Sequence, residues 1–169
     1  MGMKSLSSRL KVLYNLKAMF ILLLEYSTKG DYIMEESKHL NKENLLKVLK
    51  KSYSPYSQFR VSAQIVEETS GESFFGCNVE NASYGATVCA ERSAISNMIS
   101  GVGSLSKIIE IHIVSDQKTP ISPCGICRQS LAEFSNSKTK IFCYSNDFSS
   151  QKIYTVSEIL PDAFVEVPS

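Results

Sequence analysis

The sequence comprises 169 residues, 43% of them hydrophobic, with a formal net charge of +1, which suits one domain with a single core. Residues 1–34 carry five basic and two acidic side chains, so residues 35–169 carry thirteen basic and fifteen acidic ones. A protein that tracks a phosphate backbone normally shows a basic stripe, so this acidic balance argues against a nucleic-acid partner.

Residues 1–34 precede the domain that we expect over residues 35–169. Basic residues come before an apolar run at residues 18–24, which is too short to span a bilayer. This pattern is typical of a signal peptide or an organelle presequence, but no small-residue cleavage site follows it. Two further interpretations stay open. The segment is a dispensable amphipathic helix, or translation starts at Met34 and the upstream residues belong to the gene model only.

From residue 41 onward the sequence predicts alternating helices and strands. Leu45, Leu46, Val48 and Leu49 mark an amphipathic helix, which the turn at residues 52–57 ends. Strands are predicted at residues 59–66, 73–77, 107–115, 140–144 and 152–156, with a hairpin turn at 70–72. A second helix is predicted at residues 88–100, after a loop at 78–87. A third is predicted at residues 125–134, after the strand at 107–115. This order predicts an α/β fold in which helices pack on a mixed sheet.

Three cysteines lie at spacings that suit a metal site. Cys124 and Cys127 form a Cys-x-x-Cys pair at the start of one predicted helix, and Cys89 lies at the start of another. Such a pair can place both sulfurs on one zinc ion, and a third sulfur from a second helix leaves one tetrahedral position open for water. The sequence therefore predicts one catalytic zinc ion per chain.

Glu91 is separated from Cys89 by a single residue. It would lie beside the open position without binding the metal, within reach of a proton that it takes and returns. A Cys-x-Glu motif followed by Pro-Cys-x-x-Cys is the pattern of zinc-dependent base deaminases. We therefore predict that Glu91 is the catalytic proton carrier.

The same cysteines have a plainer interpretation, as a structural zinc site or as buried free thiols. A structural site usually has four protein ligands, and neither histidine is well placed to be the fourth. His39 lies in a polar stretch, and His112 alternates with isoleucines in a strand. Cys77 and Cys143 lie in apolar runs and are predicted to be buried thiols rather than a disulfide, which favours a reducing, cytoplasmic location.

The charge of the predicted site needs compensation. Three thiolates around a divalent zinc ion give a formal charge of −1, which weakens the metal as a Lewis acid. Helix N-termini stabilise thiolates. Arg92 and Arg128 follow Cys89 and Cys127 closely and are candidates to donate hydrogen bonds to the sulfurs. The alternative for each arginine is an ordinary surface ion pair.

Four segments closely resemble the small tetrameric cytidine deaminases. They are Tyr-Ser-Pro-Tyr-Ser-Gln-Phe at 53–59, Gly-Cys-Asn-Val-Glu-Asn-Ala-Ser-Tyr at 76–84, Cys-Ala-Glu-Arg-Ser-Ala at 89–94 and Ser-Pro-Cys-Gly-Ile-Cys-Arg-Gln at 122–129. The likeness runs from about residue 42 to residue 164. It implies a three-layer αβα sandwich with a mixed five-stranded sheet, one zinc ion per chain, and a homotetramer with shared active sites and no membrane association.

The resemblance also implies the reaction, which is hydrolytic deamination of cytidine and deoxycytidine to uridine and deoxyuridine. Glu91 would carry a proton from the water to ring N3 and then to the leaving amine. Asn78 and Glu80 resemble the pair that binds the ribose hydroxyls, where a carboxylate would repel a phosphate. This favours nucleosides over nucleotides as substrates.

Four further positions resemble substrate contacts of the family. Phe59 matches an aromatic residue that packs at the pyrimidine and sugar, and the Ala90 backbone N–H matches a donor to the ring carbonyl. Tyr84 and Phe164 match residues that complete the active site of a neighbouring subunit. For the three aromatic residues the alternative role is core packing.

The sequence departs from the family pattern at Arg60 and Ser62, which replace the usual proline and glycine, and in the extension at residues 1–34. Two rival functions remain open. One is a related deaminase that acts on an aminonucleoside antibiotic such as blasticidin S, on a nucleotide or on a base in a nucleic acid. The other is a catalytically inactive zinc protein that serves in binding or assembly, which the presence of Glu91 disfavours.

Overall fold

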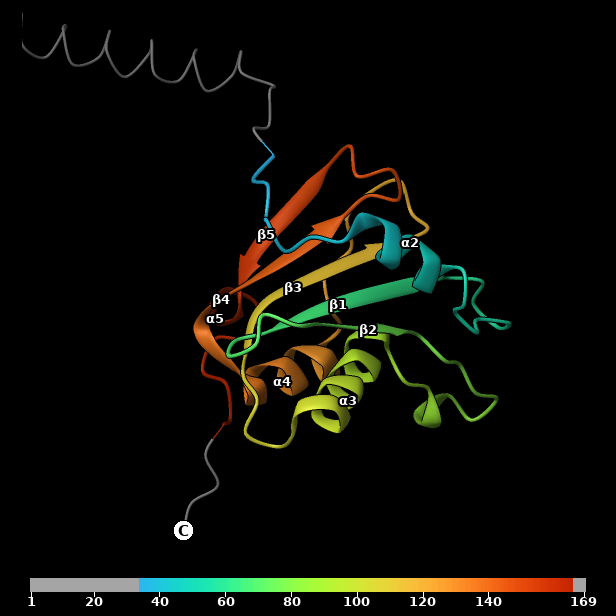
Figure 1. Ribbon diagram of the computed structural model, residues 1–169. Coiled ribbons are helices and arrows are strands. Elements are labelled where there is room, and N and C mark those ends of the chain that lie inside the picture. Colours follow the sequence, from blue (N-terminus) through green and yellow to red (C-terminus); the bar gives the residue numbers. More distant parts are fainter. Residues whose placement is uncertain (1–33, 166–169) are drawn as a thin grey trace, which may run out of the picture. The chain divides into compact units, whose positions relative to one another are not determined.

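The computed structural model describes residues 34–165, which form a five-stranded mixed sheet with helices on both faces (Figure 1). The strands are β1 (Val61–Glu67), β2 (Ser73–Cys77), β3 (Ile108–Ser115), β4 (Ser135–Tyr144) and β5 (Gln151–Thr155). The helices are α2 (Lys42–Leu49), the 3₁₀ turn η1 (Tyr84–Ala86), α3 (Ala90–Val102), α4 (Gly125–Phe134) and α5 (Val156–Ile159). This arrangement confirms the predicted α/β fold.

The strands lie in the order β2-β1-β3-β4-β5. Strands β3 and β4 are parallel, and each of the other neighbouring pairs is antiparallel. A parallel pair needs a crossover connection, usually a helix, and α4 supplies it between β3 and β4. The crossover brings α4 to the same face of the sheet as α3 (Figure 1).

Alternating side chains give the sheet two buried faces, since successive residues of a strand point to opposite sides. Ile111 and Ile113 of β3 belong to the larger apolar cluster with Ala94 and Met98 of α3. Val114, Phe142 and Tyr144 lie on the other face and pack with Leu45 and Leu49 of α2. The result is the expected three-layer sandwich, with α3 and α4 below the sheet and α2 above it in the view of Figure 1.

His112 is buried on the α2 face of the sheet. Its ring stacks on Phe142 and Tyr144, and its Nδ1 atom lies 3.0 Å from the Tyr144 hydroxyl. His112 is therefore a residue of the sheet, as its alternation with isoleucines predicted.

The segment at residues 35–41 crosses this same face before α2 begins. Lys140 of β4 forms an ion pair with Glu35, and the Ser37 hydroxyl donates to Glu110 of β3. Gln64 of β1 bonds to two backbone groups nearer the helix, the carbonyl of residue 39 at 2.6 Å and the N–H of residue 41 at 2.9 Å. Polar side chains of three strands therefore hold this segment on the sheet.

Most predicted elements are present, with different ends. Helix α3 begins at Ala90 rather than residue 88, because Val88 forms an antiparallel bridge with Val79 and Cys89 is extended. Strand β1 begins at Val61 rather than residue 59, after a left-handed residue at Gln58. Strand β4 begins at residue 135, but its regular pairing with β3 starts at residue 140, as predicted.

The sequence analysis missed α5 and η1, and it assigned Val156 to the last strand. Val156 instead begins α5, after a capping box formed by Thr155 and Glu158. The Thr-x-x-Glu spacing is a known signal for a helix start and was the clue to this short helix. Within residues 34–165, no helix is long and apolar enough to cross a membrane. The interpretations of residues 1–33 fall outside the described residues.

Gly76 of β2 allows α3 to lie directly on the sheet. A Cβ atom at this position would lie 2.4 Å from the backbone nitrogen of Ala94 and 2.5 Å from the carbonyl oxygen of Ala90. These are backbone atoms of α3, so they cannot turn away as a flexible side chain can. Any larger residue must therefore move the helix that begins at the candidate site.

We expect Gly76→Val to destabilise the protein by about 1–3 kcal/mol, the usual cost of overpacking a well-filled interior. Urea unfolding at a fixed protein concentration measures this loss. Gly85→Ala is the matched control, because a Cβ atom at Gly85 meets nothing within 4 Å, and it should shift stability by no more than about 0.5 kcal/mol. Equal stability of Gly76→Val and the parent would contradict the close contact.

Candidate active site and metal centre

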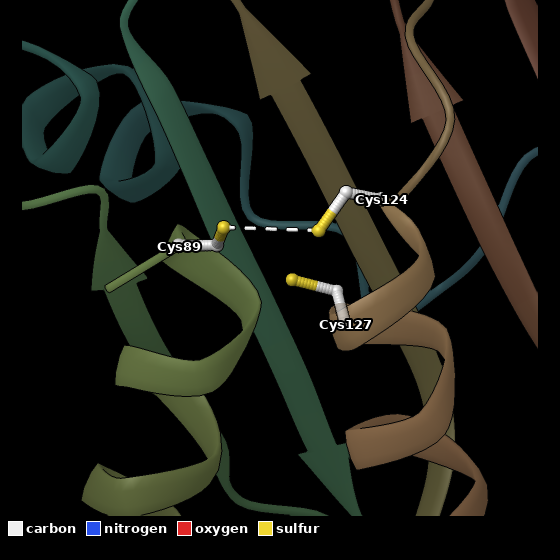
Figure 2. A group of neighbouring side chains, drawn as sticks. All are labelled: Cys89, Cys124 and Cys127. Atoms are coloured by element: carbon white, nitrogen blue, oxygen red, sulfur yellow. Dashed lines mark hydrogen bonds between the residues drawn. The ribbon is translucent and has the colours of Figure 1, made fainter. Parts of the chain in front are cut away.

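Three cysteine side chains meet where α3 and α4 begin. Cys89 is the N-cap residue of α3, Cys124 is the N-cap residue of α4, and Cys127 lies in the first turn of α4. Their sulfur atoms all lie within 4.8 Å of one another, and those of Cys89 and Cys124 are 3.9 Å apart. Figure 2 shows the three side chains pointing toward a common point between the two helices. The structure thus brings together the three predicted ligands.

The spacing of these sulfurs fits a zinc ion. Zinc–sulfur bonds of about 2.3 Å at tetrahedral angles separate two sulfurs by about 3.8 Å, which agrees with the 3.9 Å between Cys89 and Cys124. Neither cap residue uses its side chain to cap its helix, so both sulfurs are available as ligands. Within residues 34–165, Cys89, Cys124 and Cys127 form the one group of three or more acidic, histidine or cysteine side chains that is close enough to hold a metal ion.

The surroundings favour ionised sulfur. A hydrogen bond from Cys127 lowers the pKa of Cys89 to about 6, and the nearby charge of Arg92 adds to this effect, whereas burial and Glu91 oppose it. The helix N-termini contribute partial positive charge at the same place. The pKa of Cys127 moves upward, since its proton is held by the hydrogen bond to Cys89. A divalent cation would replace that shared proton.

Glu91 lies in the first turn of α3 and only 4% of its surface is exposed. Burial raises the pKa of its carboxyl group, and hydrogen bonds from its own backbone and from Cys127 partly oppose that shift. The carboxylate is therefore next to the cysteine cluster, but it is not one of the grouped ligands. A buried carboxyl group with a raised pKa beside a metal site is suited to accepting and returning a proton.

A short backbone frame joins the cysteine cluster to the predicted substrate residues. Val79 and Val88 exchange two backbone hydrogen bonds, of 2.9 and 3.0 Å, so that residues 78–80 lie beside the chain that leads into Cys89. Val79 also forms a parallel bridge with Tyr53. The loop at residues 53–58, the segment at 78–80 and the first metal ligand are therefore held in fixed relation.

Asn78 is buried and its side chain is largely engaged within the chain. Its Oδ1 atom accepts from the Val61 N–H at 2.8 Å and from the Ser52 hydroxyl, and its Nδ2 atom donates to the Phe59 carbonyl at 2.8 Å. An amide group has two N–H donors, so one remains for a ligand. These bonds fix the orientation of the side chain before any substrate arrives.

Glu80 holds the loop at residues 53–58. Its carboxylate accepts from the backbone N–H groups of Tyr56, at 2.9 Å, and Ser57, at 3.2 Å, and from the Ser57 hydroxyl. The Ser57 hydroxyl lowers the pKa of this carboxyl group most strongly, and the backbone donors add to the shift. Glu80 therefore stays negatively charged at neutral pH.

The three predicted aromatic residues have different surroundings. Phe59 is partly buried and packs against the larger core cluster, which includes Ala90. Tyr84 is 76% exposed and Phe164 is 65% exposed, so neither side chain is packed in the core of its own chain. The backbone N–H of Ala90 belongs to the first turn of α3, where N–H groups have no acceptor within the helix.

Arg128 takes a position that the sequence analysis did not foresee. Its guanidinium donates to the Pro123 carbonyl at 2.8 Å, to the Ile159 carbonyl at 3.1 Å and to the Ser122 hydroxyl at 3.4 Å. Arg128 therefore holds the loop that carries Cys124. The predicted hydrogen bond from Arg128 to a cysteine sulfur stays a prediction. Arg92 is half-buried, and its charge acts on Cys89.

Ser52, Ser57 and Gln129 were not singled out from the sequence. The two serines orient Asn78 and Glu80, and Gln129 donates to the Phe164 carbonyl at 2.6 Å. All three lie inside or next to the motif segments, but a serine or glutamine has no distinctive spacing. Their roles depend on tertiary contacts.

Comparisons with known proteins agree with this geometry. Residues 35–143 match the family model described as "Cytidine and deoxycytidylate deaminase zinc-binding region". The chain is 44% identical to the cytidine deaminase of Mycoplasma pneumoniae over 121 residues, which cover 71% of this chain and 88% of the relative. It is 42% identical to that of Halalkalibacterium halodurans over 113 residues, covering 67% of this chain and 83% of the relative.

A solved structure is also similar. The crystal structure of cytidine deaminase from Burkholderia pseudomallei superposes with a TM-score of 0.67 at 35% sequence identity. The match covers 76% of this chain and all of that chain.

Replacement of Cys127 by alanine should release zinc, because two thiolates cannot retain the ion as three do. Elemental analysis of the desalted protein should give about one zinc ion per chain for the parent and little for the variant. Cys77→Ser is the matched control, since that thiol lies outside the cluster. Full zinc occupancy in Cys127→Ala would remove this cysteine from the ligand set.

Proposed function

The chain belongs to the cytidine and deoxycytidylate deaminase family, and we propose that it hydrolyses cytidine and deoxycytidine to uridine and deoxyuridine, releasing ammonia, as a step of pyrimidine salvage. The observation that carries this proposal is the meeting of three cysteine sulfurs with the buried carboxylate of Glu91. A protein that used zinc only for structure would have no use for a buried proton carrier at that point.

Glu91 performs the proton transfers of the proposed reaction. Zinc held by Cys89, Cys124 and Cys127 supplies the Lewis acidity that activates water. The Glu91 carboxylate would accept a proton from the attacking water and deliver it to ring N3 while the oxygen bonds to C4. It would then take the remaining proton from the new C4 hydroxyl and pass it to the amino group, so that the C4–N bond breaks and ammonia leaves. Burial raises the pKa of Glu91, which makes it a stronger base than an exposed carboxylate and a competent acid after it has taken the proton.

Asn78 and Glu80 select the substrate. Asn78 keeps one N–H donor for a ribose hydroxyl. Glu80 accepts three bonds from residues 56 and 57, and a carboxylate has about four acceptor sites, so one remains for another hydroxyl. Because the Glu80 pKa is lowered, its negative charge would repel a sugar phosphate. Nucleosides are thus the proposed substrates, with Phe59 packing at the pyrimidine and sugar and the Ala90 N–H donating to the ring carbonyl.

A homotetramer with shared active sites is proposed for the working enzyme. Cys124, Tyr84 and Phe164 are all exposed in a single chain, so the chain alone does not shield the reaction from water. Tyr84 and Phe164 from neighbouring subunits would supply the missing cover. The free cysteines of the described residues fit a reducing compartment, and we propose a cytoplasmic location on that basis.

Glu91→Gln tests the chemistry, because glutamine keeps the shape of the side chain and cannot carry the proton. We expect zinc content and cytidine binding to be retained, while turnover falls by at least the ~10²–10⁴-fold typical of a lost acid–base group. The loss of cytidine absorbance measures the rate. Glu72→Gln, on the exposed hairpin turn, is the control with the same chemical change. Near-normal turnover of Glu91→Gln would refute the mechanism.

Mixed oligomers test the shared site. Glu91→Gln and Phe164→Ala chains should each be nearly inactive alone. In hybrids, some sites combine an intact Glu91 with an intact Phe164 from a neighbour, so activity should exceed the sum of the separate preparations. The shared site would be refuted if sedimentation shows a monomer that is fully active, or if verified hybrids show no recovery of activity. Phe164 would then act within its own chain.

A further inference from the structure

Helix α4 contacts the C-terminal segment of the chain at two points. The residues that make these contacts, Arg128 and Gln129, directly follow the metal ligand Cys127. Arg128 donates to the carbonyl of Ile159, the last residue of α5, and Gln129 donates to the carbonyl of Phe164. Hydrogen bonds from two side chains of the metal-binding helix thus hold the C-terminal segment, one just before residue 160 and one at residue 164.

Arg128 also bonds to the other side of the site. Its Nε atom donates to the Pro123 carbonyl, one residue before Cys124, while Nη1 reaches Ile159. The guanidinium is planar and rigid, so its donors keep fixed directions. A shift of the Cys124 loop would therefore be passed to the end of α5.

Apolar packing holds part of the C-terminal segment, since Leu160 and Ala163 pack against the larger core cluster. A hollow of about 260 Å³ lies between this segment and the end of α4, lined by Ala132, Leu160, Pro161 and Ala163 among others. The chain between α5 and Phe164 is irregular, with a left-handed residue at Asp162. The bonds from Arg128 and Gln129 therefore add to this packing in setting the position of the segment.

The contact at Phe164 involves the backbone and leaves the ring free. Gln129 binds the carbonyl at 2.6 Å, while the residue remains 65% exposed. The hydrogen bond therefore restrains the backbone from which the exposed ring projects. This is the arrangement expected of a residue that contacts another molecule.

We propose that Arg128 and Gln129 are positioning residues that join the metal loop to the C-terminal segment, so that zinc bound to one chain restrains the backbone that carries its Phe164 ring. The consequence for a neighbouring active site rests on the proposed function. The mechanical link itself does not, because it lies within one chain. The fold already brings the three sulfurs together. A bound metal ion would restrain the Cys124 loop and the first turn of α4 further, and the two side chains would pass that restraint to residues 160–165.

A single fluorophore can test the link, since the sequence has no tryptophan. Phe164→Trp places an indole at the reporting position and keeps the backbone carbonyl that Gln129 binds. Acrylamide quenching of its fluorescence should increase when a chelator removes zinc. Adding Gln129→Met, which has similar length and no N–H donor, should raise quenching in the zinc-loaded protein and abolish the response to zinc removal. Ser130→Ala in the same background is the control, because that hydroxyl bonds only within α4, to Ile126.

Two outcomes would overturn the proposal. One is a quenching level that zinc does not change, and the other is a zinc response that survives Gln129→Met, which would place the signal in a neighbouring subunit. Arg128→Lys provides a second measurement, since lysine cannot reproduce the three directed bonds. It should release zinc to a chelator about tenfold faster, in line with other residues that orient metal ligands, and parent-like release would count against the link. Neither readout requires cytidine turnover, so a failed deamination assay would be a separate result.

Discussion

The site depends on two helices that begin at the same point. Thiolates repel one another, and three can share a small volume only where positive charge compensates them. The first turns of α3 and α4 supply part of that charge, and Arg92 adds to it at Cys89. The metal ion supplies the rest. Because both helices pack on one face of the sheet, their meeting point is set by the fold before any metal binds.

Gly76 shows how closely this meeting point is controlled from outside the site. It has no direct contact with a sulfur, but the backbone of α3 lies against it. The contact at Gly76 therefore sets the distance between α3 and β2, and this distance sets the positions of Cys89 and Glu91 at the start of the helix. The proposed substrate-binding residues are held similarly, since the bridge between Val79 and Val88 ties Asn78 and Glu80 to the same helix start.

The sequence predicted the chemistry of the site better than the contacts around it. The convergence of Cys89, Cys124 and Cys127 could be predicted because cysteines at these spacings near two helix starts suit one metal ion, whereas the catalytic role of Glu91 stays a prediction. The sheet could be predicted from the alternation of apolar residues. The start of α3 was misjudged because Val88 is apolar and fits a helix, while its bridge to Val79 exists only in the folded chain. The acceptors of Arg128 were equally hidden, since Ile159 is 31 residues away in sequence.

The polar contacts of residues 35–41 also determine where the chain could be shortened without loss of these bonds. Removal of residues before Glu35 would leave the bonds to Lys140, Glu110 and Gln64 in place. A truncation that began at α2 instead would remove their partners, and with them Leu40, which packs against the cluster that contains Phe142 and Tyr144. For expression of a minimal protein or attachment of a label, the useful boundary is therefore set by this segment and not by the first helix.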